Sequence, residues 1–300
     1  MLRTIVCAFA VLLAVSARAQ VSASYSPPPS SASLLSRINL SAAAPLDAAY
    51  EREFVACDGS LPGAVGKDYF GGFNLRRPGV PSSQQYYLCS RDPNNVRALL
   101  RLADGGILWE SKMALDVDGS WAAWNGLPGA TDLKRTAYTW PGATDRQART
   151  AQIDPDRIPY VVIPTDGKAS LTGSRSRALG RAFGLKTGLK MGDMGVAIYR
   201  DRWTPVLIGD GGPFMRLGEG SSRVFEALGQ TRCRRWNADR TTCVGTGGAY
   251  PYINAGISRG VIFILYPGSR DPALRPSNAV ARLCAFARQK LSLRGGATCS

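Results

Sequence analysis

Two acidic residues nine positions apart, Asp210 and Glu219, are the side chains in this sequence best placed to do chemistry. Each carries a glycine on both sides, which lets backbone or a ligand approach the carboxylate closely. A pair of carboxyl groups is what general acid and base cleavage of a glycosidic bond requires. The alternative is that both acids only form turns, where Asp is common. The pattern therefore makes Asp210 and Glu219 the candidate catalytic pair.

A second group of candidates lies within residues 109–119, where a strand-like stretch carries Lys112, Asp116 and Asp118 ahead of a glycine. Apolar and acidic residues alternate there, which places both acids on one face if the strand continues through them. Asp-x-Asp-Gly is similar to the start of a calcium loop, but the remaining ligands of such a loop are missing. A turn, a solvated edge and a substrate cleft all stay open. We expect no bound metal and no cofactor.

Further candidates come from a glycine turn and from aromatic residues. Asp193 precedes an apolar strand, where forming the turn is the alternative to binding substrate. Trp121 and Trp124 follow the Asp118 turn, and aromatic faces can stack on sugar rings, although tryptophan is more often packed in a core. The predicted substrate-binding residues are Lys112, Asp116, Asp118, Asp193, Trp121 and Trp124.

The absence of histidine restricts the chemistry. Ser-His-Asp and Cys-His nucleophile systems are excluded, and so is a histidine general base. Zinc is not expected, because no cysteine pair has the C-x2-C spacing. Catalysis must therefore use carboxylates, lysine, tyrosine or a cofactor.

The first 19 residues predict export. Arg3 precedes an apolar run over residues 5–15 and an Ala-Arg-Ala cleavage site at residues 17–19. We predict a signal peptide over residues 1–19 that is cleaved near Ala19–Gln20, and a secreted or periplasmic protein. No later stretch approaches the ~18 apolar residues of a membrane span, so we expect no membrane insertion.

Removal of the leader takes Cys7 and leaves six cysteines. An even number in an exported chain predicts disulfides, although many pairings are open. Pairing each cysteine with its nearest neighbour in sequence predicts the bridges Cys57–Cys89, Cys233–Cys243 and Cys284–Cys299.

The chain is strongly basic, with a formal net charge of +15 that falls to +13 when Arg3 and Arg18 leave with the leader. Such a charge favours polyanionic partners. The basic residues are scattered apart from residues 232–235, and no nucleic-acid-binding motif accompanies them, so we expect no nucleic-acid partner. We expect a monomer that binds a polysaccharide.

Composition and periodicity predict one β-rich domain. Residues 20–50 are rich in Ser, Ala and Pro and predict a flexible or extended linker, followed by the domain over residues 51–300. Predicted strands cover residues 106–110, 160–163, 195–199, 205–208 and 260–266, and predicted helices cover residues 222–228 and the stretch after Ser277. Many short strands and few helices favour a barrel or a sandwich.

Taken in order, these segments resemble the fungal-type chitosanases, glycoside hydrolase family 75. The matching segments read SKMALDVDG (111–119), IPYVVIP (158–164), GDMGVAI (192–198), IGDGGP (208–213) and LGEGS (217–221). The resemblance covers about residues 89–229, and its last two motifs are the most specific. It implies a secreted, inverting, endo-acting hydrolase of β-1,4-linked glucosamine polymers, with the essential acids at Asp210 and Glu219.

The Asp-Gly-Gly-Pro turn is also similar to the carboxylate turn of double-psi β-barrel enzymes, among them lytic transglycosylases and expansin-like proteins. The expected fold is therefore mainly β (α+β), a six-stranded double-psi β-barrel with loop and helix additions and disulfides. The higher ordinary pKa of glutamate favours Glu219 as acid and Asp210 as base. Against that, the predicted helix after Glu219 would stabilise its ionised form.

The positive charge of the chain does not fit chitosan, because a basic protein repels a polycation beyond the ~8 Å Debye length. Two alternatives therefore stay open. One is a lytic enzyme that acts on peptidoglycan or another wall polysaccharide, and the other is an expansin-like wall-binding protein without catalysis.

Overall fold

The computed structural model describes residues 25–38, 40, 42–46, 98–128, 132–165, 173–212, 217–293 and 299, and for residues 173–179 it describes the backbone alone. The strands are β1 (Ala44–Pro45), β2 (Ala98–Arg101), β3 (Ile107–Leu115), β4 (Tyr160–Pro164), β5 (Met194–Tyr199), β6 (Arg202–Gly212), β7 (Glu219–Gly220) and β8 (Ile257–Tyr266). The α-helices are α1 (Ala32–Leu35), α3 (Trp121–Trp124), α4 (Gly173–Thr187), α5 (Ser222–Ala227) and α6 (Ala279–Leu291).

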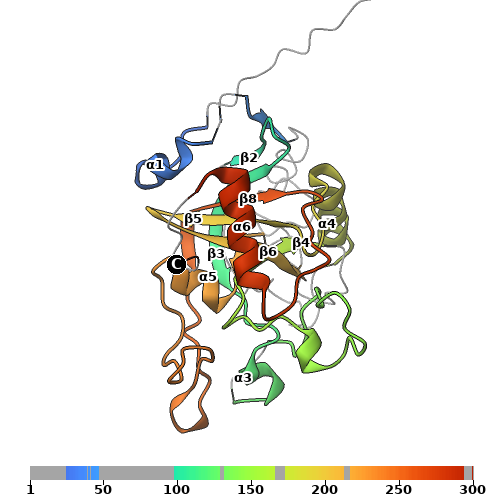
Figure 1. The fold of residues 1–300 in the computed structure, drawn as a ribbon, viewed down its shortest axis with the longest axis vertical. Helices are drawn as coiled ribbons and strands as arrows, with labels where there is room; N and C mark the ends of the chain where they lie inside the picture. Colours follow the sequence, from blue (N-terminus) through green and yellow to red (C-terminus); the bar gives the residue numbers. More distant parts are fainter. Residues whose placement is uncertain are drawn as a thin grey trace, which may run out of the picture.

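Six strands close into a barrel in the order β3-β7-β4-β6-β5-β8, with β8 pairing back to β3. The pairs β3–β7 and β4–β6 are parallel, and the other pairs around the ring are antiparallel. Strands β1 and β2 extend the sheet beyond β3. The protein is thus a mixed α/β protein dominated by a closed six-stranded β-barrel, which confirms the predicted barrel (Figure 1).

The main core cluster takes side chains from strands β3, β4, β5, β6 and β8. At its centre Trp109 stacks on Phe263 with ring centroids 5.0 Å apart. The neighbours of these two residues along the strands, Leu108 and Ile264, belong to a second cluster on the opposite face of the sheet. This alternation is what a period of two along a strand produces. Helix α6 covers that outer face, where Ala287 contributes to the second cluster (Figure 1).

All five predicted strands are present, most of them longer than predicted. The predicted hairpin joins β5 to β6, with Tyr199 paired to Arg202 across a two-residue turn in which Arg200 has a φ of 56°. Helix α5 confirms the predicted helix at residues 222–228, and Ser221 caps it by accepting a hydrogen bond from the backbone N–H of Val224. Helix α6 begins at Ala279, with Asn278 rather than Ser277 as its N-cap.

The N-terminal stretch differs from the predicted flexible linker. Part of it forms α1 and β1, and Leu35 is buried in the second core cluster. The physical reason is that apolar residues are interspersed among the Ser, Ala and Pro of this stretch. What the sequence predicts for residues 1–24 and 51–97 stays a prediction, because these residues lie outside the described ones.

Two of the three predicted disulfides are confirmed, Cys233–Cys243 and Cys284–Cys299. Cys57 and Cys89 lie outside the described residues. None of the described helices has the length and apolar character that crossing a membrane requires.

Candidate functional site

The candidate acids are carried by three neighbouring strands of the barrel. On β4, Val162 pairs with Asp210 of β6 on one edge and with Glu219 of β7 on the other. Glu219 in turn pairs with Ala114 of β3. Residues paired directly across strands point to the same face of a sheet. The register therefore places Asp210 and Glu219 on one face, on either side of Val162.

A β-bulge turns Asp210 onto this face. The register between β4 and β6 shifts after Val161–Ile208, so that Val162 pairs with Asp210 rather than with Gly209. Without the shift, Asp210 would share the core-facing orientation of Ile208. A Cβ added to Gly209 would lie 2.6 Å from the Cβ of Tyr160, so only glycine fits there. The bulge is therefore the local feature that presents the Asp210 carboxyl group to the site.

Asp116 and Asp118 reach the same place from the end of β3. The backbone N–H of Asp118 donates to Oδ1 of Asp116 at 3.0 Å, and the hydroxyl of Tyr160 donates to the backbone carbonyl of Asp118 at 3.1 Å. Gly119 completes the turn with a φ of 80°, and a Cβ there would lie 2.3 Å from the carbonyl oxygen of Ile153. The buried tyrosine thus ties the Asp116–Asp118 turn to β4.

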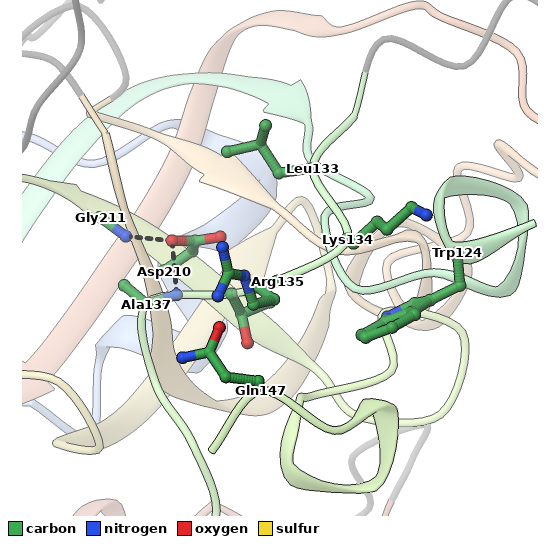
Figure 2. Close-up of a pocket in the computed structure, with 9 residues that line it drawn as sticks. Trp124, Leu133, Lys134, Arg135, Ala137, Gln147, Asp210 and Gly211 are labelled. Atoms are coloured by element: carbon green, nitrogen blue, oxygen red, sulfur yellow. Dashed lines mark hydrogen bonds between the residues drawn. The ribbon is translucent and has the colours of Figure 1, made fainter. Parts of the chain in front are cut away.

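Residues 133–137 cross the site and bind an acid at each end. The backbone N–H of Leu133 donates to Oδ1 of Asp118 at 2.6 Å. The backbone N–H of Ala137 donates to Oδ1 of Asp210 at 2.9 Å, and that oxygen also accepts from Gly211 at 2.7 Å. Both donors on Asp210 are drawn in Figure 2. Asp118 and Asp210 are therefore held by backbone donors at fixed positions.

A pocket of about 640 Å³ opens beside Asp210. It is lined by Asp210 and Gly211 of β6, by Trp124 of α3, by residues 133–137 and by Gln147. Figure 2 shows Asp210 at one end of the pocket and Trp124 with Lys134 at the other, with Arg135 and Gln147 between them. A pocket of this volume can hold a small-molecule ligand, and the Asp210 carboxyl group belongs to its wall.

The electrostatics of the site favour protonated carboxyl groups. Burial and the charge of Asp116 raise the pKa of Asp210 well above its ordinary value, and they outweigh the two backbone donors, which lower it. Burial and the charge of Asp210 raise the pKa of Asp118 from 3.8 to about 8. Two carboxylates in a poorly solvated site cannot both ionise at low cost, so the pair retains a proton near neutral pH.

Oδ2 of Asp210 is the atom that distinguishes this site. It is buried and has no hydrogen-bond partner among the described residues, while Oδ1 accepts two bonds. A buried acceptor without a donor is costly unless the oxygen carries a proton or meets a ligand. A protonated Asp210 would hold its proton on this oxygen and could donate it.

A cation is the other occupant that these acids could hold. Asp116, Asp118 and Asp210 each offer one carboxylate oxygen, and the three oxygens lie within 4.8 Å of one another. Oxygen ligands of this kind suit calcium or magnesium. The sequence predicts no metal from Asp116 and Asp118 alone. The fold brings Asp210 beside these two acids, which gives three possible ligands.

The structure separates the other predicted substrate-binding residues. Lys112 is half-buried on β3, two positions before Ala114, and therefore lies on the face that carries Glu219. Trp124 lines the pocket, whereas Trp121 is half-buried at the start of α3 and is not part of the lining.

Asp193 has the turn role that the sequence left open. Its carboxylate accepts bonds from the backbone N–H groups of Lys190 and Arg270, and it does not line the pocket beside Asp210. It joins two turns and is not placed to contact a substrate there. Burial raises the pKa of Asp193, although three backbone donors lower it.

Sequence reasoning missed Tyr160, Lys134, Arg135 and Gln147. The sequence predicts Tyr160 only as part of a core strand, and no spacing pattern links it to Asp118. Lys134 and Arg135 are adjacent cations in a segment rich in Gly and Pro, a weak signal until the fold places them beside Asp210. Comparisons of the chain with protein-family models and with curated proteins found no match, so the interpretation of the site rests on its geometry.

Proposed function

We propose that the protein is a glycoside hydrolase that cleaves β-1,4-linked sugar polymers by acid and base catalysis. The observation that carries the proposal is Oδ2 of Asp210, a buried oxygen without a partner among the described residues, on a residue that lines the pocket. A carboxyl group whose pKa is raised by burial is the usual proton donor of glycosidases.

In this proposal Asp210 is the acid and Glu219 is the base. The assignment reverses the roles that the ordinary pKa of glutamate favoured, because burial and Asp116 raise the pKa of Asp210. Glu219 is buried on β7 and raises the pKa of Asp210 further by its charge. A proton retained on Asp210 can protonate the leaving oxygen while Glu219 activates water.

The strand positions support inversion at the sugar carbon. Asp210 and Glu219 pair to opposite edges of β4, so two strand spacings of ~4.8 Å separate them. Inverting enzymes keep their two carboxyl groups ~6.5–9.5 Å apart, and retaining enzymes ~5–5.5 Å. The oxygens of Asp118 and Asp210 lie within 4.8 Å, which is close to the retaining distance. Product stereochemistry therefore tests whether Glu219 or Asp118 is the partner of Asp210.

The remaining parts of the proposal come from the resemblance to family 75 chitosanases. They are a double-psi connection of the barrel strands and secretion after loss of residues 1–19; the resemblance alone would also imply chitosan as substrate, which the positive charge of the chain does not favour. The parallel pairing of β4 with β6, and the two disulfides, are compatible with this interpretation.

Two alternatives follow from specific features. A lytic enzyme acting on an acidic wall polymer suits the net charge of +15. A wall-binding protein without catalysis would use the same pocket to hold a sugar. It would bind a polymer without releasing any product.

Release of reducing ends from chitosan, peptidoglycan and carboxymethyl cellulose tests the proposal. Asp210→Asn and Glu219→Gln should each slow hydrolysis by ~10²–10⁴-fold while circular dichroism stays unchanged. Asp201→Asn is the matched control, because Asp201 is exposed in the β5–β6 turn. NMR should show that the first product has the inverted anomer. An Asp210→Asn variant that keeps more than about a tenth of the rate would remove Asp210 from the mechanism.

A further inference from the structure

The pocket beside Asp210 has a cationic wall made by Lys134 and Arg135. Both side chains are exposed and both residues line the pocket. Among the described residues, neither side chain takes part in an ion pair or a hydrogen bond. Two acids close to them in sequence have other hydrogen-bond donors, since Asp132 accepts from the hydroxyl of Tyr250 at 2.6 Å and Asp145 accepts from the backbone N–H of Gln147 at 2.8 Å. The wall thus presents two positive charges to the pocket.

The backbone fixes these cations next to the reacting acids. Leu133 is bound to Asp118 and Ala137 to Asp210, so Lys134 and Arg135 lie between two anchored ends. Thr136, next along the segment, is buried and donates its hydroxyl to the carbonyl of Tyr138 at 2.8 Å. A segment held this way loses little conformational freedom when its side chains bind a ligand.

Trp124 supplies the surface that a sugar ring needs at the other end of the pocket (Figure 2). Its indole N–H is buried and has no hydrogen-bond partner among the described residues. An indole ring that lines a pocket can contact a sugar ring through its face. Leu133, 65% exposed, adds apolar surface to the same wall.

We propose that this pocket binds a sugar residue that carries a carboxylate, so that the substrate is an acidic β-1,4-linked glycan. The proposal rests on the proposed hydrolase function and specifies its substrate class. Arginine binds a carboxylate through two parallel hydrogen bonds, and lysine adds a point charge. The net charge of +15 draws a polyanion to the protein and repels a polycation such as chitosan. Among the described residues that line this pocket, Asp210 is the one acid.

Three hexasaccharides with the same linkage and different charges test the proposal. They are the β-1,4-linked hexamers of glucuronic acid, glucose and glucosamine, which are anionic, neutral and cationic. Their affinities are measured by isothermal titration calorimetry on the mature chain carrying Asp210→Asn, so that the ligands stay intact. Hydrolysis of the same hexamers is measured on the wild-type chain.

Arg135→Gln and Lys134→Gln remove the two charges, and Arg146→Gln is the matched control. Arg146 is exposed in the same region but does not line the pocket. We expect the glucuronic acid hexamer to bind at least ~10-fold more tightly than the glucose hexamer. Arg135→Gln should remove most of that difference. Arg146→Gln should leave the difference nearly unchanged, and neither variant should change the affinity for the glucose hexamer by much.

Three results would overturn the proposal. The first is equal or tighter binding of the glucosamine hexamer, the second is an Arg135→Gln variant that behaves like Arg146→Gln, and the third is no binding of any hexamer. The binding arm does not depend on catalysis. If the wild-type chain cleaves no hexamer but binds the glucuronic acid hexamer through Arg135, the proposed hydrolysis fails while the acidic-sugar pocket stands. If it cleaves the glucosamine hexamer best, hydrolysis stands and this proposal fails.

Discussion

Replacing Asp118 with asparagine should make the protein more stable, and increasingly so as the pH rises. Burial and the charge of Asp210 raise the pKa of Asp118 from 3.8 in an unperturbed chain to about 8 in the fold. Below pH 3.8 both the folded and the unfolded chain hold this proton. Between pH 3.8 and 8 only the folded chain holds it, so the free energy of unfolding falls as the pH rises.

The size of the effect follows from these two values. Each pH unit above 3.8 lowers the free energy of unfolding by ~1.4 kcal/mol, so that the loss accumulated at pH 7 is ~4 kcal/mol. The asparagine side chain of this variant would be neutral at every pH, and its carboxamide oxygen can still accept the N–H of Leu133. Because Asp210 shares the proton and part of the cost, we expect Asp118→Asn to stabilise the protein by ~1–4 kcal/mol at pH 7.

Urea denaturation of the disulfide-intact protein at pH 4, 6 and 8 measures the difference. The advantage of Asp118→Asn should be small at pH 4 and grow toward pH 8, while Asp201→Asn at the exposed β5–β6 turn should show no such trend. An advantage that is the same at all three pH values would refute the reasoning. A loss of stability at pH 8 would show that the carboxylate is satisfied in the fold, and hence that the acids do not repel one another.

The remaining predictions concern activity, metals and a second buried acid. Activity should fall as the pH rises through about 8, because the Asp118–Asp210 pair then loses its proton. Asp118→Asn should move this fall to lower pH, because the variant removes a like charge beside Asp210 and so lowers the pKa of Asp210. Chelation by EDTA should leave the melting temperature and the rate unchanged, since protons neutralise the acids; a melting temperature that rises with added calcium would assign a cation to them instead. Asp156→Ala should lower the free energy of unfolding by ~2–5 kcal/mol in urea titrations, because it leaves the N–H of Cys243 and the hydroxyl of Tyr252 buried without acceptors, and Asp156→Asn should cost less.

The barrel strands could be predicted because their signals are local. Strand β5 and the core part of β8 are runs of apolar and β-branched residues bounded by glycine, proline or aspartate, and they pack on both faces. Helix α4 (Gly173–Thr187) was missed for a physical reason. Glycines interrupt its sequence, and it lacks a strong apolar stripe, so no periodic signal separates it from a loop.

The candidate site could be predicted only in part. Glycine-flanked acids made Asp210 and Glu219 candidates, and the fold places both on one face of the sheet. Strand alternation was expected to bring Asp116 and Asp118 together, but β3 ends at Leu115, and the turn that follows the strand brings their oxygens close instead.

Alternation alone gives the wrong face for Asp210. Asp210 lies two positions after the buried Ile208, so a regular strand would point both side chains into the core. The bulge at Gly209 reverses that face, and it depends on the ring of Tyr160, about 50 residues away in the sequence.

Asp156 and Asp210 are both buried, and a comparison of the two shows that burial alone does not indicate catalysis. Asp156 is as enclosed as Asp210, but donors surround its carboxylate: Ser222 and Tyr252 donate hydroxyl groups, and Cys243 donates a backbone N–H at 2.7 Å. These bonds tie the segment before β4 to α5 and to the disulfide loop, which is a structural role. Asp210 has donors on one oxygen only among the described residues, and the residue lines a pocket.

A fold that needed Asp210 only for stability would have satisfied both oxygens, as it does for Asp156, because an unmade hydrogen bond to a buried oxygen costs ~1–3 kcal/mol. It would also have kept other carboxylates away, whereas the oxygens of Asp116 and Asp118 lie within 4.8 Å of it. Local instability of this kind persists where it serves chemistry. The unsatisfied oxygen and the crowded charges therefore support a proton-donating role for Asp210 independently of any resemblance in sequence.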